Sequence, residues 1–381
     1  MKQFRGKCGL LLVALLVGAG ALQAQAPEGP MAPRQGQPVQ QAPPNAQGKL
    51  KVLVELVNMP VTVRDAKGAM VHNLEAKDFR ITDNGMEQKI SHFDLGGDPV
   101  SVVILIETSS RIDPILPGIR KTGILFTQTV MGLNGEAAIV GFNDAVDKLQ
   151  DFTSDGDSIE NVVTHLQTGT SGSRLYDAMA VGVEMLSDRP QPTAEKPGRR
   201  RVLLIVSEAL DFGSESKLGE VLRKAQLANV TIYSVGLSTT RAELYGKRRN
   251  TPAPITPPGI SSVPPPPGTI QTPTTEANQN NGADLLALAI WAVQHIESQV
   301  KDRPLEVATT ATGGAYLSTY KDGSIEKAID EIGGELHAQY TIGYAPTDGN
   351  DFGYHEIRVQ VNRRDMKVRT RPGYYVAPPE S

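Results

Sequence analysis

The chain has 381 residues and a formal net charge of −4 at pH 7, with acidic and basic residues interspersed. This length is enough for one large or two small domains with linkers. The balanced charge argues against nucleic acid or an anionic membrane surface as a partner. Hydrophobic residues make up 39% of the chain, so a core can be buried. Beyond the N-terminal segment, however, no stretch is long and apolar enough to span a bilayer.

Residues 1–26 are predicted to form a secretory signal peptide. A basic start is followed by an apolar stretch from Gly9 to Leu22 and by the small residues Ala24 and Ala26. The apolar stretch is too short to favour a transmembrane helix, so the protein is expected to be periplasmic or secreted. Its only cysteine, Cys8, lies within this signal, and the mature protein should contain no disulfide. Residues 27–48, rich in Pro and Gln, are expected to form a flexible linker.

Residues 49–97 have the pattern of a β-rich segment. Apolar residues between positions 53 and 63 predict a strand that Pro60 interrupts or confines to a sheet edge. Two further strands are predicted at Phe79–Thr82 and Gln88–Phe93. The sequence Asp83-Asn84-Gly85 between them is a strong hairpin signal.

Two later stretches are continuously apolar and predict strands that are covered on both faces. They are Val100–Ile106, followed directly by Glu107, and Val202–Val206, followed after Ser207 by Glu208. In an open α/β sheet, ligands bind in the crevice beyond the carboxyl ends of the strands. The two acids and the polar residues beside them are therefore candidates for a functional site.

Predicted strands and helices alternate from residue 98 to residue 338, which indicates a doubly wound, mostly parallel, Rossmann-like α/β sheet. The further strands are predicted at Ala137–Phe142, Leu149–Phe152, Val230–Leu237 and Ala315–Leu317. The helices are predicted at Ile115–Met131, Ile159–Leu166, Leu175–Leu186, Leu285–Ile296 and Ile325–Leu336. Residues 238–282 hold a basic patch and a proline cluster but no core-forming pattern, so a disordered insertion is expected there.

Residues 339–376 form a second β-rich segment. Strands are predicted at Gln339–Tyr344, Tyr354–Val361 and Met366–Thr370. Neither this segment nor residues 49–97 has enough strands to bury two sheet faces alone. We therefore expect the N- and C-terminal segments to pack together as one smaller β-domain.

The strand-end residues resemble those of the von Willebrand factor type A family. There, a metal-ion-dependent adhesion site consists of an Asp-x-Ser-x-Ser loop, a Thr before a helix and an Asp after a later strand. The matching positions are Glu107, Ser109, Arg111, Ser173 and Glu208. Four of these five side chains differ from the family pattern, so the resemblance implies a type A domain over residues 98–338 with a degenerate metal site. The flanking segments, with Val61-Thr62-Val63 and Arg371-Pro372-Gly373-Tyr374-Tyr375, resemble an exported bacterial subfamily of acidobacterial type.

Arg111 stands where the family has a serine, and a guanidinium cannot ligate a cation. It could instead donate charge-assisted hydrogen bonds to Glu107 or Glu208 and occupy the site as an internal cation. The candidate metal ligands are at most Glu107, Ser109, Ser173 and Glu208. We expect no cofactor beyond weakly bound Mg²⁺ or Mn²⁺.

Enzyme functions find little support in the sequence. It contains no Gly-rich phosphate loop after the first buried strand, no nucleophile elbow and no histidine pair at metal-ligand spacing. The expected function is non-catalytic binding of a protein or ligand at the carboxyl edge of the sheet. One alternative is a scaffold of the cell envelope that uses the β-domain and the proline-rich insertion. The other is a hydrolase that uses Glu107 and Glu208.

Overall fold

The computed structural model describes residues 56–190, 198–237, 285–295, 303–319, 325–347 and 352–376. The predicted signal peptide, the linker and the insertion at 238–282 lie outside these residues. The chain divides into two compact units, Met1–Val52 and Leu53–Ser381, and every element below belongs to the second. Within the described ranges, no helix has the length and apolar character needed to cross a membrane. The predicted boundaries at 97/98 and 338/339 stay predictions.

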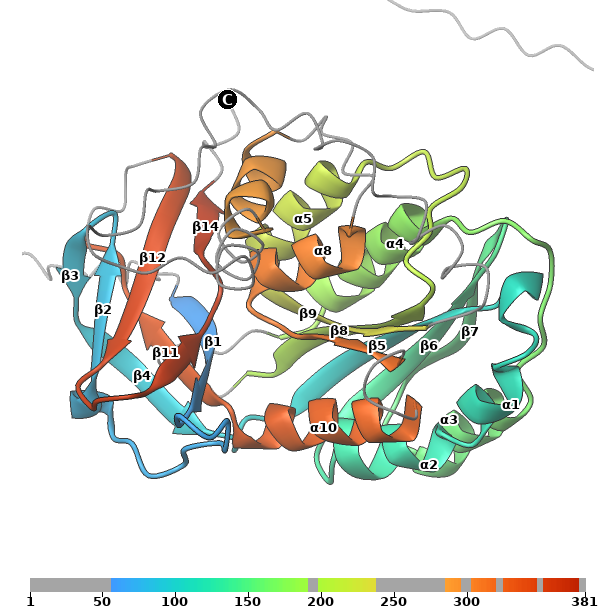
Figure 1. Cartoon of the computed structure of the whole chain (residues 1–381), viewed down its shortest axis with the longest axis horizontal. Coiled ribbons are helices and arrows are strands. Elements are labelled where there is room, and N and C mark those ends of the chain that lie inside the picture. The colour runs from blue at the N-terminus through green and yellow to red at the C-terminus, as the bar shows by residue number, and fades with distance from the viewer. Residues whose placement is uncertain are drawn as a thin grey trace, which may run out of the picture. The chain divides into compact units, whose positions relative to one another are not determined.

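A six-stranded sheet with the order β10-β9-β8-β5-β6-β7 forms the centre of the α/β part (Figure 1). Its strands are β5 (Val100–Glu107), β6 (Glu136–Phe142), β7 (Val146–Thr153), β8 (Arg200–Ser207), β9 (Val230–Gly236) and β10 (Tyr316–Ser318). All neighbouring strands are parallel except β6 and β7, which pair antiparallel, and β7 lies at the edge of the sheet. Every residue of β5 is buried, as its continuous apolar sequence predicts. The expected mostly parallel α/β sheet is confirmed.

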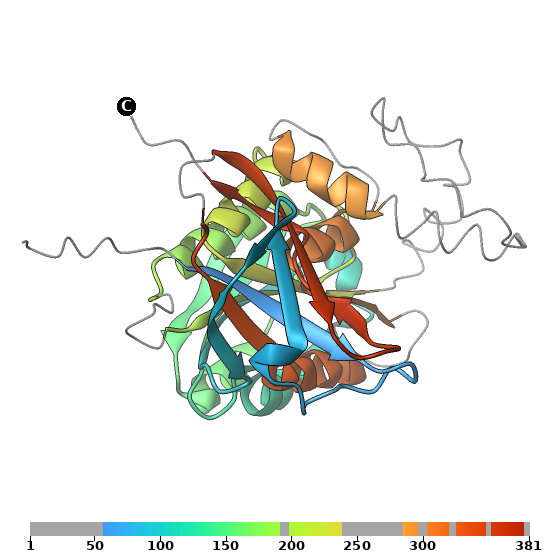
Figure 2. The same cartoon turned by 90° about the vertical axis from the view of Figure 1, so that its left-hand side faces the viewer.

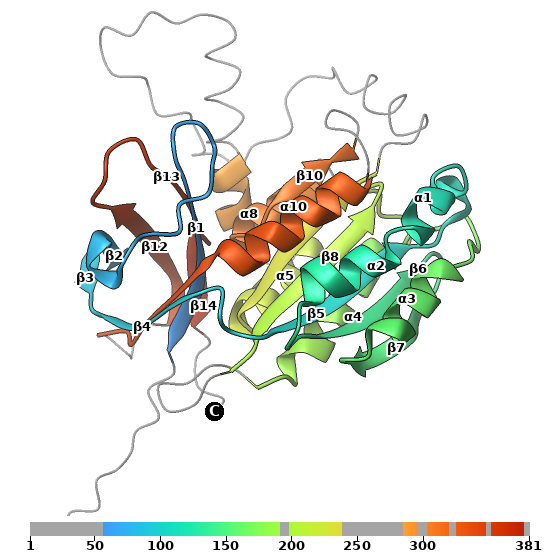
Figure 3. The same cartoon turned by 90° about the horizontal axis from the view of Figure 1, so that it is seen from below.

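Helices cover both faces of this sheet (Figures 1 and 3). One face carries α4 (Leu175–Ser187), α5 (Leu218–Leu227), α8 (Pro304–Thr312) and a helix at residues 285–294. The other carries α1 (Leu116–Arg120), α2 (Gly123–Leu125), the π-helix η3 (Phe126–Met131), α3 (Gly156–Thr164) and α10 (Ile325–Ala338). Each layer forms its own apolar core with alternate residues of the strands, as expected of a doubly wound sheet.

The single helix predicted at Ile115–Met131 is wrong, because the segment is broken into α1, α2 and η3. Threonine hydroxyls in this segment donate to carbonyl oxygens of the preceding turn. Thr122 Oγ1 lies 2.7 Å from the Ile119 oxygen, and Thr129 Oγ1 lies 2.8 Å from the Leu125 oxygen. Such bonds compete with the regular helical ladder and bend helices. Apolar spacing alone does not reveal this.

The β-rich segments at the two ends of the α/β part form two four-stranded sheets, ordered β13-β1-β11-β4 and β14-β12-β2-β3. The N-terminal strands are β1 (Val57–Arg64), β2 (Phe79–Asp83), β3 (Met86–Gln88) and β4 (Ile90–Leu95). The C-terminal strands are β11 (Tyr340–Tyr344), β12 (Gly353–Val361), β13 (Lys367–Arg369) and β14 (Gly373–Val376). Figure 2 shows the two sets interleaved, and one apolar core unites both sheets. The expected shared β-domain is confirmed.

Two details of the β-domain test the prediction. At Pro60 the expected edge position is confirmed and the expected interruption is wrong: β1 runs through Pro60, and β13 pairs with β1 only from Thr62 onward, so the side of β1 beside Pro60 has no ladder. The predicted strand Gln88–Phe93 is divided at Lys89, because β3 pairs with β2 whereas β4 pairs with β11 in the other sheet. The chain thus changes sheets at Lys89.

Adjacent glycines in α10 have opposite surroundings, which gives a first prediction. A Cβ on Gly333 would lie 2.6 Å from the backbone oxygen of Thr129, whereas a Cβ on Gly334 would meet nothing within 4 Å. We expect Gly333→Ala to lower the free energy of unfolding by about 1–3 kcal/mol through overpacking. Gly334→Ala should raise it by about 0.5–1 kcal/mol through helix propensity. Urea denaturation measures both, and effects of equal sign would contradict the close contact of α10 with η3.

Candidate functional site

The candidate site lies where the order of the six-stranded sheet reverses. Strand β5 pairs with β6 on one side and with β8 on the other, so the chain leaves β5 between two diverging crossovers. Glu107 is the last residue of β5, and Glu208 directly follows β8. The carboxyl ends of parallel strands meet at one edge, so these two acids flank the crevice where such folds bind ligands.

Glu107 is fully buried, and both of its carboxylate oxygens accept hydrogen bonds. Oε1 accepts from the hydroxyl of Ser109 at 2.6 Å and from Nη2 of Arg111 at 2.7 Å. Oε2 accepts from the hydroxyl of Ser207 at 2.8 Å and from the backbone N–H of Glu208 at 2.9 Å. A buried carboxylate is costly unless it is paired and hydrogen-bonded. These four donors meet that need.

Arg111 holds the two acids together from the short helix η2 (Ser110–Ile112). Its Nη2 lies 2.7 Å from Glu107 Oε1 and its Nε lies 3.0 Å from Glu208 Oε2, with only 7% of its side chain exposed. Nη1 donates to the backbone carbonyl of Ser171, and the guanidinium carbon lies 5.2 Å from the centroid of the Phe212 ring. The planar fork of the guanidinium is thus engaged on three sides and covered by an aromatic ring.

The fifth candidate, Ser173, has a different environment. It is buried, its hydroxyl donates to the backbone oxygen of Leu210 at 2.8 Å, and its own backbone carbonyl accepts from Phe212. The structure therefore brings together Glu107, Ser109, Arg111 and Glu208, while Ser173 joins the loop before α4 to the loop after β8. Among the described contacts, Ser173 makes no hydrogen bond to the other four.

Sequence reasoning missed three groups that complete the site: the hydroxyl of Ser207, the carbonyl of Ser171 and the ring of Phe212. For Ser207 a signal existed, because a polar residue closes an otherwise apolar strand beside the acid that follows it. Ser171 acts through its backbone, and Phe212 acts through the fold of a loop. Neither role leaves a mark in the sequence.

The residues present do not fit a divalent metal ion, which the resemblance to the type A family would imply. The guanidinium of Arg111 lies between the two carboxylates that would have to bind the ion. The Ser109 hydroxyl is directed to Glu107, and the Ser173 hydroxyl to a backbone carbonyl. A guanidinium offers only donors, so an ion would have to displace it.

The loop after Glu208 is tied to α4 by Asp177, which gives a pH-dependent prediction. Asp177 accepts from the backbone N–H groups of Ser216 at 2.8 Å and Glu215 at 3.1 Å, and from Nε of Arg174 at 2.7 Å. Burial raises the pKa of the Asp177 carboxyl. The hydrogen bonds from Ser216 and Glu215, together with that from Arg174, outweigh burial, and the net pKa is lowered.

A carboxyl whose pKa is lowered by folding stabilises the protein above its unfolded pKa, about 3.9 for Asp. This stabilisation is lost as the pH falls through the folded pKa. We expect Asp177→Asn to lower the free energy of unfolding by about 1–3 kcal/mol at neutral pH. The difference from the wild type should shrink once the pH falls below about 3.9. Urea denaturation across this range tests it, and a pH-independent difference would contradict the assignment.

No protein-family model and no curated protein sequence matches the chain. An aerotolerance-related membrane protein from Bacteroides fragilis is similar over 62% of this chain and 98% of that chain, at 11% identity and a TM-score of 0.38. The protein BatB from Bacteroides thetaiotaomicron is similar over 62% of this chain and 97% of that chain, at 13% identity and a TM-score of 0.37. A von Willebrand factor type A protein from Catenulispora acidiphila is similar over 48% of this chain and 40% of that chain, at 10% identity and a TM-score of 0.32. These likenesses are too low to transfer a function to this chain.

Proposed function

We propose that the chain is an exported, non-catalytic type A domain protein that binds a protein partner at the carboxyl edge of its six-stranded sheet. The observation that carries this proposal is the burial of Arg111 between Glu107 and Glu208 at the sheet's reversal point. In this proposal the guanidinium replaces a metal ion as the cation that orders the edge loops. Export rests on the predicted signal peptide, and Mg²⁺ or Mn²⁺ binds weakly or not at all.

The loops around Arg111 supply the surface for a partner. Residues fixed by buried hydrogen bonds present their neighbours in a defined geometry, and rigid support of this kind favours recognition. Phe212 rests on the guanidinium, yet 53% of the residue is exposed. Glu215, three residues further along the chain, has a side chain that is 90% exposed, and it pairs with Arg174 at 3.0 Å. An exposed aromatic ring on a rigid loop is a typical anchor for a protein partner.

The hydrolase alternative is disfavoured by the state of the two acids. A general acid or base must be able to exchange a proton with a substrate. Each oxygen of Glu107 already accepts two hydrogen bonds, and Glu208 is paired with Arg111 at 3.0 Å. Neither carboxylate is left free to serve a substrate. The scaffold alternative would use the surface of the β-domain instead of the carboxyl edge of the sheet. Each surface has an exposed aromatic residue, and substituting each one in turn distinguishes the two functions.

The test compares two phenylalanines of similar exposure. The immobilised mature protein is used to capture partners from an envelope extract, with EDTA or with Mg²⁺. Phe212→Ala, at the carboxyl edge, should reduce capture. Phe352→Ala, beside β12 of the β-domain and 55% exposed, should leave it unchanged. Capture should also be the same with EDTA and with Mg²⁺.

Each other outcome has a definite meaning for the proposal. If only Phe352→Ala reduced capture, the scaffold function would replace edge binding. If EDTA abolished capture, binding would depend on a metal and the role of Arg111 as the ordering cation would be wrong. Turnover of a chromogenic ester, glycoside or peptide substrate that Glu107→Gln abolished would contradict the non-catalytic assignment.

A further inference from the structure

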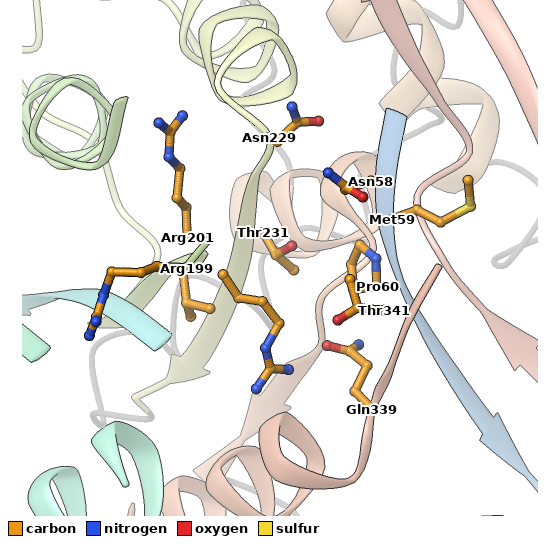
Figure 4. A pocket seen from close by; sticks show the side chains of 11 residues that line it. Asn58, Met59, Pro60, Arg199, Arg201, Asn229, Thr231, Gln339 and Thr341 are labelled. Carbon is orange, nitrogen blue, oxygen red and sulfur yellow. The ribbon is translucent and has the colours of Figure 1, made fainter. Parts of the chain in front are cut away.

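A small cavity lies at the opposite end of the six-stranded sheet, where β8 begins and the β-domain packs against it. About 40 Å³ of it is open to water-sized molecules. Its wall includes Arg200 and Thr231 from the sheet, Asn58 from β1 and Thr341 from β11, together with Asn229 and Gln339 (Figure 4). None of the described residues that line it is acidic. The cavity is therefore polar and lined by groups that can donate hydrogen bonds.

Two of the three arginines at this wall have partners elsewhere. Arg199 donates to the Ser101 hydroxyl at 2.8 Å and pairs with Glu136 at 3.3 Å. Arg201 donates to the backbone oxygen of Ala228 at 2.7 Å. Figure 4 shows both side chains directed away from Thr341 and Gln339. Of the three lining arginines, only Arg200 remains to supply charge to the cavity.

Arg200, which points to the other face of the strand, is incompletely satisfied. Nη1 donates to the backbone oxygen of Leu336 at 2.6 Å and Nε to that of Asp98 at 3.4 Å. Nη2 is buried and has no hydrogen-bond partner among the described residues, and the same holds for the hydroxyl of Thr341. Burial lowers the pKa of Arg200. The carboxylates of Asp98 and Asp94, which do not line the cavity, raise the same pKa by a smaller amount.

A second buried guanidinium lies behind the same wall. Arg371 is 4% exposed and its Nη1 donates to Oδ1 of Asn229, a lining residue, at 2.9 Å. In the part of the chain that the structure describes, its Nε and Nη2 lack hydrogen-bond partners, and no carboxylate forms an ion pair with it or with Arg200. Buried cations are costly unless an anion compensates them. Two guanidiniums that lack an ion pair among the described residues, with Asp98, Asp94 and Asp83 acting on them only from a longer distance, therefore lie around a polar cavity.

We propose that this cavity binds a small anion, either a halide or a compact carboxylate. Nη2 of Arg200 and the hydroxyl of Thr341 donate to it, and Arg371 contributes positive charge through the wall. A water molecule needs about 10–15 Å³ of such space, so the cavity has room for an ion of a few heavy atoms and no more. The anion compensates the buried cations and links the first residues of β8 to β11 of the β-domain. It is separate from the carboxyl-edge site.

The test measures thermal unfolding of the mature protein in bromide, chloride or acetate. The sodium salt of a bulky sulfonate, too large for the cavity, keeps the ionic strength constant. We expect bromide, chloride or acetate to raise the melting temperature saturably by about 2–4 °C. A response to the halides assigns a free ion, and a response to acetate alone assigns a carboxylate. An effect that does not saturate, or no effect of either class, overturns the proposal.

Variants locate the effect. Arg200→Met should abolish the anion response, whereas Arg199→Met removes the same formal charge from the neighbouring residue and should keep it. Thr341→Val removes one donor without changing the charge, so it should weaken anion affinity several-fold even if Arg200→Met fails to fold. An unchanged response in Thr341→Val, or equal loss in Arg199→Met, overturns the site. In bromide-soaked crystals, an anomalous peak within hydrogen-bond distance of Arg200 Nη2 is expected, and density without an anomalous signal there would mean water only.

Discussion

Replacing Arg111 with serine is expected to lower the free energy of unfolding by about 3–5 kcal/mol in metal-free buffer. The reason is the burial of the acids, since Glu107 and Glu208 both have side-chain exposures of 0% and share this guanidinium. Without it, two carboxylates remain buried with no cation between them. Arg174→Ser is the control, because Arg174 is 30% exposed and its partners Asp177 and Glu215 have side chains that are 14% and 90% exposed. Its loss should cost clearly less than that of Arg111, because the guanidinium is partly exposed and Asp177 keeps the backbone donors of Glu215 and Ser216.

The same substitution should create affinity for a divalent ion. Serine supplies an oxygen where the guanidinium stood and frees both carboxylates for the oxygen coordination that Mg²⁺ and Mn²⁺ require. We expect Arg111→Ser to bind Mn²⁺ at least about 100-fold more tightly than the wild type, because the ion no longer has to break a buried pair. Adding Glu107→Asp and Glu208→Asp restores the shorter reach of the family pattern and should strengthen binding further.

Calorimetric titration with Mg²⁺ and Mn²⁺ measures these affinities, and thermal unfolding with and without Mn²⁺ gives a second measure. Mn²⁺ should restore much of the stability that Arg111→Ser loses and should leave the wild type and Arg174→Ser unchanged. Micromolar binding by the wild type would show that Arg111 does not exclude the ion. If the triple variant bound nothing, the carboxyl edge could not be a former metal site.

Local sequence signals were sufficient for the elements that depend on local chemistry. The continuous apolar runs of β5 and β8 predicted buried parallel strands, and both are buried almost throughout. The turn at Asn84 and Gly85 was predicted from their tolerance of positive φ, and they adopt φ of 46° and 83°. The pairing partner of each strand was harder to predict. The chain changes sheets at Lys89 because β4 pairs with β11, which lies far along the chain.

The candidate site was predictable only where it depends on the positions of residues relative to the strands. The proximity of Glu107 and Glu208 follows from their positions after neighbouring parallel strands. The resemblance to the type A family places Arg111 beside them, at the last serine position of the Asp-x-Ser-x-Ser loop, and the observed distances agree with that placement. The covering ring of Phe212 and the carbonyl of Ser171 come from loops whose paths are fixed by tertiary packing. No residue pattern encodes those paths.

A second buried charge joins the two parts of the fold. Glu335 of α10 is 4% exposed and accepts hydrogen bonds from groups of both parts. Tyr233 of β9 donates its hydroxyl at 3.1 Å, and Arg64 of β1 donates Nη2 at 3.1 Å. Arg369 of β13 also donates to it, and the Thr62 hydroxyl lies 3.3 Å away. One carboxylate thus holds the β-domain against the α/β part.

Glu335→Gln is therefore expected to lower the free energy of unfolding by about 3 kcal/mol. This value is at the lower end of the range for breaking a buried ion pair, because both arginines are partly exposed. The amide would turn a donor toward Arg64 or Tyr233 and leave one of them without an acceptor. Glu331→Gln, one turn earlier on α10, is the control: Glu331 is 48% exposed and lies 3.8 Å from the same Arg64. Its substitution should cost less than about 1 kcal/mol.

Urea denaturation gives the two values, and hydrogen exchange should show faster opening of β1 and β13 in Glu335→Gln alone. Equal losses in the two variants would mean that the arginines, and not the buried carboxylate, hold the two parts together.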